Sequence, residues 1–81
     1  MVTSEQIRAA RALLRWEQKD LAKASTVSLP SIKRLEGLSG ELAAQQRTIA
    51  AITNAFDAAG ICFLADGEMV GGGIGVRLKR G

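Results

Sequence analysis

The stretch QKDLAKASTVSLPSIKRLEG constrains the fold more than any other part of the chain, because it is an amphipathic helical pattern that is interrupted in the middle. Leu21 starts an apolar stripe, the letters STVS break it, and Ile32 resumes it. Pro30 lies inside the second part, and a proline cannot occupy the interior of a continuous helix. The pattern therefore predicts two short helices, over residues 18–24 and 28–36, joined by a tight turn.

The second short helix has a start signal and two distinct faces. Ser28 is placed to act as the N-cap, and Pro30 then falls in the first turn, where its missing N–H costs nothing. Ser28, Ile32 and Leu35 recur at helical spacing, so we expect all three to point inward. The core of the two-helix unit is predicted to comprise Leu21, Ala22, Val27, Ile32 and Leu35. The outward face carries Pro30, Ser31, Lys33 and Arg34, with Leu29 at its edge.

Two further helices flank this unit. Thr3, followed three residues later by Gln6, has the form of a capping box and predicts a helix that ends before Trp16, which is interpreted as a partly buried packing residue. Apolar residues at helical spacing predict another helix over residues 46–59, and Gly60 stops it.

After Gly60 the pattern favours strands. Residues 61–65 and 76–79 are predicted to form an antiparallel β-hairpin around a glycine-rich loop. A two-stranded ribbon is barely stable alone, so it must pack on the helices, on a second subunit, or on both. The pairs expected to share a face are Ile61 with Phe63 and Val76 with Leu78.

The hairpin carries three features with more than one interpretation. The letters GGGIG resemble a phosphate-binding loop, but the strand-like VRLKR follows them where a helix is required, so a hairpin loop is favoured. Cys62 is expected to be a half-buried strand residue, with an intersubunit disulfide as the alternative. The basic residues that either face solvent or add phosphate contacts are Arg77, Lys79 and Arg80.

Composition excludes several classes of function. The chain has 81 residues, enough for one domain, and it contains no histidine and one cysteine, so the usual zinc sites and nucleophile–histidine pairs are excluded. We expect no enzyme activity, no cofactor and no metal.

The charged N-terminus is not a signal peptide, and no apolar run approaches the roughly 20 residues that span a bilayer. We therefore expect a cytoplasmic protein with no membrane partner. The net charge of +3, concentrated in the first 37 residues, favours a polyanionic partner, with a solvated basic face as the alternative.

The interrupted stretch resembles the helix-turn-helix of phage repressor/Cro-like (XRE) regulators. The matching positions are Gln18, Leu21, Ala22, Ser25, Val27, Ser28, Ile32, Leu35, Glu36 and Gly37. The resemblance covers roughly residues 3–60. It implies a mainly α, four-to-five-helix repressor-like domain over residues 1–60, with the helix-turn-helix at about 18–37. Residues 61–81 extend this domain as a C-terminal two-stranded antiparallel hairpin.

The resemblance also implies roles for individual residues. Phosphate contacts are expected from Gln18, Lys19 and Ser28, and base contacts from Leu29, Pro30, Ser31, Lys33 and Arg34. Arg34 can donate two parallel hydrogen bonds to guanine O6 and N7. The sequence departs from the family at Thr26, where Gly is usual, and at Glu17, where Ser or Thr is usual. Either Thr26 is strained in a left-handed conformation or the turn differs.

The resemblance thus implies a sequence-specific transcriptional regulator, a repressor, that binds double-stranded DNA as a homodimer. The hairpin and the helix over residues 46–59 are the apolar surfaces expected to form the dimer. Two alternatives stay open: an antitoxin-type protein that binds a toxin as well as DNA, and a protein-interaction module that has lost DNA binding.

Overall fold

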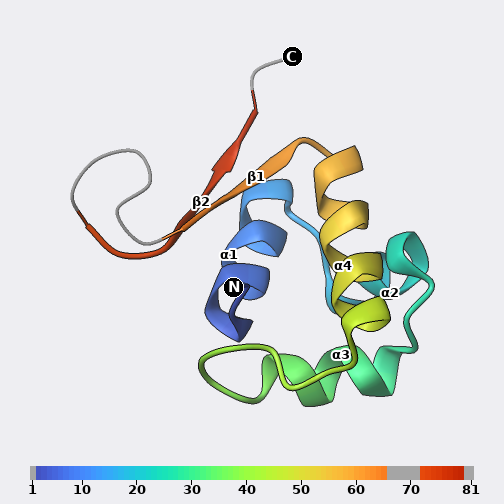
Figure 1. Ribbon diagram of the computed structural model, residues 1–81. Coiled ribbons are helices and arrows are strands. Elements are labelled where there is room, and N and C mark those ends of the chain that lie inside the picture. Colours follow the sequence, from blue (N-terminus) through green and yellow to red (C-terminus); the bar gives the residue numbers. More distant parts are fainter. Residues whose placement is uncertain (1, 66–71, 80–81) are drawn as a thin grey trace.

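The computed structural model describes residues 2–65 and 72–79, and within them four helices precede a two-stranded antiparallel sheet (Figure 1). This arrangement confirms the predicted mainly α fold with a C-terminal hairpin. No helix in these ranges is both long enough and apolar enough to cross a bilayer. The elements are α1 (Ser4–Leu14), α2 (Gln18–Ser25), α3 (Leu29–Glu36), α4 (Gln46–Ala58), β1 (Ile61–Leu64) and β2 (Gly75–Leu78).

The start of α1 is the predicted capping box, and it also holds the hairpin. Thr3 Oγ1 accepts from the backbone N–H of Gln6 at 3.1 Å, and Gln6 Oε1 accepts from the backbone N–H of Thr3 at 3.0 Å. Gln6 Nε2 donates to the carbonyls of Leu64 at 3.1 Å and Gly75 at 2.9 Å. One buried glutamine therefore caps α1 and fastens the sheet to it.

The break between α2 and α3 is a left-handed turn built without glycine. Thr26 has φ 60° and ψ 16°, so of the two alternatives that the sequence left open, the structure has the left-handed threonine. Ser25 Oγ donates to the carbonyl of Leu21 at 2.7 Å and accepts from the N–H of Val27 at 3.2 Å. The Ser25 hydroxyl therefore joins the last turn of α2 to the residue that follows Thr26.

The prediction that Ser28 points inward is wrong. Ile32 and Leu35 are buried as expected, but Ser28 is exposed. Ser28 precedes α3 with an extended backbone and is its N-cap, so helical periodicity does not orient its side chain. Its Oγ accepts from the backbone N–H of Ser31, which confirms the predicted capping role.

A single core lies where the four helices and β1 meet. Leu21, Ile32 and Leu35 belong to it as predicted, while Ala22 and Val27 are only partly buried against it. Each fully buried side chain of this size contributes about 1.5–3 kcal/mol relative to exposure. The buried apolar residues are Ile7, Ala10, Leu21, Ile32, Leu35, Leu42, Ile52, Phe56 and Ile61.

Aromatic contacts join the helices to the sheet. Trp16 is partly buried, as predicted, and stacks on Phe56 with ring centroids 5.7 Å apart. The ring of Phe63, in β1, meets Phe56 edge-on at 5.8 Å. The hairpin therefore packs on the helices of its own chain.

The strand register matches the predicted faces. Ile61 pairs with Leu78 and Phe63 pairs with Val76, so these four side chains share one side of the sheet. Cys62 is half-buried, as predicted.

Charged contacts fasten two other parts of the chain. Lys79 donates to Asp57 at 2.7 Å, and this hydrogen bond and the carboxylate charge raise the pKa of the Lys79 amine. Near the other end of the molecule, interactions with its own backbone N–H and with that of Gly40 lower the pKa of Glu5. Arg80 and the start of the GGGIG loop lie outside the described residues.

Replacing Thr26 with glycine tests the left-handed turn. A side chain in this conformation costs about 1–2 kcal/mol, part of which the greater freedom of glycine in the unfolded chain offsets. We expect Thr26→Gly to raise the free energy of unfolding by up to about 1 kcal/mol in urea denaturation. The control is Ala24→Gly in the adjacent helix α2, where glycine should destabilise by about 1 kcal/mol. Destabilisation by both variants would contradict the strained turn.

Candidate nucleic-acid interface

The outer surface of α3 is open. Pro30, Lys33 and Arg34 are exposed, while Leu29 and Ser31 are partly buried. Neither Lys33 nor Arg34 forms an ion pair with any described residue. The structure thus brings the five predicted base-contacting residues together on one helix, with two unpaired cations on its surface.

The buried end of α3 is held by a carboxylate that the sequence analysis assigned no structural role. Glu36 is 5% exposed and accepts from Arg11 Nε and Nη2, both at 2.6 Å, in a bidentate ion pair. Arg11 Nη1 also donates to the carbonyl of Trp16 at 3.0 Å. Because Glu36 follows Ile32 by one helical turn, its inward position was readable from the same spacing that placed Ile32 in the core.

Two arginines that contribute to the positive charge of the first 37 residues form intramolecular hydrogen bonds. Arg11 pairs with Glu36, and Arg8 donates to the carbonyls of Glu36 and of Leu38, the latter at 3.2 Å. Both therefore join α1 to the C-terminal end of α3. The total charge of the first 37 residues overstates the charge available to a partner.

Two of the three predicted phosphate-contacting residues, Gln18 and Ser28, lie at different ends of α3. Gln18 Nε2 donates to Glu36 Oε1 at 3.2 Å, which places this side chain beside the C-terminal end of α3. Ser28 caps the N-terminal end. The eight residues of α3 span about 12 Å at about 1.5 Å per residue. Lys19 is exposed on α2 and approaches Glu17 at 3.2 Å.

The start of α2 compensates for its unusual cap residue. The backbone N–H of Glu17 donates to the carboxylate of Asp20 at 2.8 Å. This bond is one half of a capping box, so the helix that carries Gln18 is anchored at its first turn.

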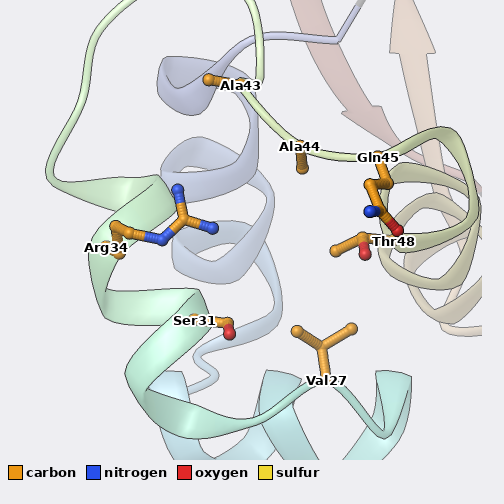
Figure 2. A pocket seen from close by; sticks show the side chains of 7 residues that line it. All are labelled: Val27, Ser31, Arg34, Ala43, Ala44, Gln45 and Thr48. Atoms are coloured by element: carbon orange, nitrogen blue, oxygen red, sulfur yellow. The ribbon is translucent and has the colours of Figure 1, made fainter.

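A hollow of about 550 Å³ lies beside α3 (Figure 2). Figure 2 shows Arg34 and Ser31 on the α3 side of this space, with Gln45 and Thr48 from the start of α4 across it. Gln45 is the N-cap of α4 but forms no side-chain cap bond, so this helix end presents backbone N–H groups. Sequence analysis missed Gln45 and Thr48, because nothing in the local pattern shows that the start of α4 returns to α3. The remaining lining residues are Val27, Ala43 and Ala44.

The outer face of α3 and the hollow beside it form one polar region, because Ser31 and Arg34 belong to both. Its polar groups are hydroxyls, amides and cations, which hold anions and hydrogen-bonding edges. Within residues 2–65 and 72–79, no three His, Cys, Asp or Glu side chains gather to hold a metal ion.

Comparison with known proteins adds no assignment. No protein-family model, no curated protein and no solved structure matches the chain.

Removing the partner of Glu36 tests the ion pair. Arg11→Met keeps much of the side-chain length but leaves a buried carboxylate without its cation, so we expect a loss of about 3–5 kcal/mol in the free energy of unfolding. Arg11→Met combined with Glu36→Gln should lose less than Arg11→Met alone, because no buried charge is left. Arg15→Met, on the exposed C-cap of α1, is the control and should change stability by less than about 0.5 kcal/mol. Equal losses for Arg11→Met and Arg15→Met would refute the structural role of the pair.

Proposed function

We propose that the protein is a sequence-specific DNA-binding transcriptional regulator, a repressor, that acts in the cytoplasm as a homodimer and inserts α3 into the major groove. The observation that carries the proposal is the exposed outer face of α3, with unpaired Lys33 and Arg34, bracketed by Gln18 and Ser28. The resemblance of residues 18–37 to the XRE helix-turn-helix agrees with it.

The dimensions of α3 suit this role. The major groove of B-DNA is about 12 Å wide and admits one α-helix. Gln18 and Ser28 lie at the two ends of a helix about 12 Å long, so each side chain can reach a phosphate on a different wall of the groove while the outer face meets the bases. In this arrangement Gln18, Lys19 and Ser28 set the position of α3.

Each side chain on the outer face of α3 is assigned a different contact with the bases. Arg34 donates two hydrogen bonds to guanine, and Leu29 contacts a thymine methyl group. Lys33 serves a base or a phosphate, and Ser31 and Pro30 contact the adjacent base edges. The open N–H groups at the start of α4, across the hollow from Arg34, favour a neighbouring phosphate. Because one short helix reads few base pairs, a dimer with reading helices about 34 Å apart completes the site.

Binding to random-sequence duplex DNA is the first test. Fluorescence anisotropy at about 50 mM and about 200 mM salt should show weak binding that falls steeply with salt, since each neutralised phosphate releases counterions. An absence of binding at low salt would refute the proposal and favour a protein-interaction module.

Arg34→Ala tests the reading of bases on duplexes selected from a random library. We expect a loss of about 1–3 kcal/mol on the selected sequence, a relaxed preference at one base pair, and a much smaller change on random duplex. Arg15→Ala is the control, because Arg15 is an exposed arginine at the C-cap of α1 and belongs neither to the proposed DNA-contacting residues nor to the hairpin. An equal loss on every sequence would remove Arg34 from the base-reading set.

Gln18→Ala tests the phosphate contact. This variant should weaken selected and random duplexes by the same factor and leave the selected sequence unchanged, because phosphates carry no sequence information. A second selection performed with the variant checks this. A changed preference would place Gln18 among the base-reading residues.

A further inference from the structure

The outer edge of β2 has backbone groups that no other strand of the described part of the chain uses. Lys79 N–H donates to the carbonyl of Gly60 at 2.6 Å, and hydrogen-bonded and non-hydrogen-bonded pairs alternate along an antiparallel ladder. The register then makes Cys62–Arg77 a hydrogen-bonded pair, so the N–H and C=O groups of Val76 and Leu78 point away from β1. Among the described residues, β2 pairs with β1 alone.

The same edge exposes large apolar side chains. Ile74, directly before β2, is 45% exposed and Leu78 is 46% exposed. Leu78 lies on the same side as Val76 by strand periodicity, and Ile74 lines the same hollow as Val76. Natural edge strands usually protect themselves with charges, proline or a covering element. Arg77 projects to the other side of the sheet, so the apolar side is not protected in this way.

We propose that β2 pairs with β2 of a second copy of this chain, antiparallel, with the two-fold axis at Val76. This register places Leu78 opposite the partner's Ile74 and Arg77 opposite the partner's Gly75. The contact between Leu78 and Ile74 then forms twice, once on each side of the two-fold axis. Each Arg77 faces a residue without a side chain. An axis at Arg77 would instead set two like charges opposite each other, which is destabilising.

The adjacent surface of α1 enlarges the interface. A hollow of about 160 Å³ lies between α1 and β2, with Glu5 and Ala9 on one side and Ile74 and Val76 on the other. One turn beyond Ala9 on the same helix face, Leu13 is 44% exposed. Stable interfaces bury about 1,200–2,000 Å² in total, more than a short strand edge supplies, so the α1 surface has to contribute.

This inference rests on the homodimer in the proposed function, but its test needs no DNA. Light scattering after size exclusion and sedimentation equilibrium measure the dimer dissociation constant of the full chain. Leu78→Lys and Ile74→Glu should each raise it by about 100-fold, because each substitution occurs twice in a symmetric dimer. Leu38→Lys is the matched control, since Leu38 is 43% exposed in the loop after α3, and it should leave the constant unchanged.

The double variant tests the register. Leu78→Lys combined with Ile74→Glu places opposite charges across the two-fold axis and should restore the dimer in a salt-sensitive manner. A pairing centred on Arg77 would not place these two residues opposite each other, so failure of the rescue would overturn the register.

Hydrogen exchange tests the edge without any substitution. The amides of Val76 and Leu78 should exchange slowly at concentrations where the dimer forms and faster on dilution, while the Arg77 amide, bonded to β1, should respond less. A wild-type chain that stays monomeric, or a dimer that survives Leu78→Lys and Ile74→Glu, would overturn the inference. Salt-sensitive binding of random duplex by the monomeric variants would show that the DNA-binding proposal stands independently of this surface.

Discussion

A buried ion pair at the C-terminal end of α3 helps to orient this helix, together with the core packing of Ile32 and Leu35. Glu36 lies almost entirely out of solvent at the end of α3, and Arg11 of α1 neutralises it through two parallel hydrogen bonds of 2.6 Å. Such a pair is directional, and a buried carboxylate without its partner is strongly destabilising. Gln18 donates to the same carboxylate. The contact that helps to orient α3 therefore also holds the amide proposed to meet a phosphate, which couples the placement of the candidate site to the packing of α1.

The break between α2 and α3 allows both helices to pack on the same core. Two short helices joined at Thr26 can change direction between them, which one continuous helix cannot do. Leu21 of α2 and Ile32 of α3 are therefore buried in the same core, while Lys33 and Arg34 stay exposed. The left-handed threonine is the local cost of that geometry. Hydrogen bonds from Ser25 and the cap at Ser28 offset part of it. The turn at Thr26 therefore places apolar residues of both helices in the core and leaves the proposed binding face of α3 exposed.

Much of this structure could be predicted because it depends on local chemistry. The Thr3–Gln6 capping box, the start of α3 at Ser28 and Pro30, and the paired faces of the hairpin all follow from residues that are neighbours in sequence or at fixed spacing. Ser28 shows the limit of that reasoning. Spacing placed it inward, but a cap residue stands outside the helix and does not follow helical periodicity. Arg8 and Arg11 were counted as available charge, because a sequence does not show which cations are engaged by distant carbonyls and carboxylates.

The sequence by itself determined, to within a residue or two, where the helices begin and end, that Leu21, Ile32 and Leu35 belong to the core, and which side chains lie on the outer face of α3. Those features follow from propensity, capping and periodicity, which act over a few residues. Only the tertiary structure decided that Gln18 lies at the C-terminal end of α3 and that Gln45 and Thr48 lie across a hollow from Arg34. It also decided that, within residues 2–65 and 72–79, β2 pairs with no strand other than β1. These features depend on contacts between segments far apart in the chain, and such contacts form only when the whole core packs.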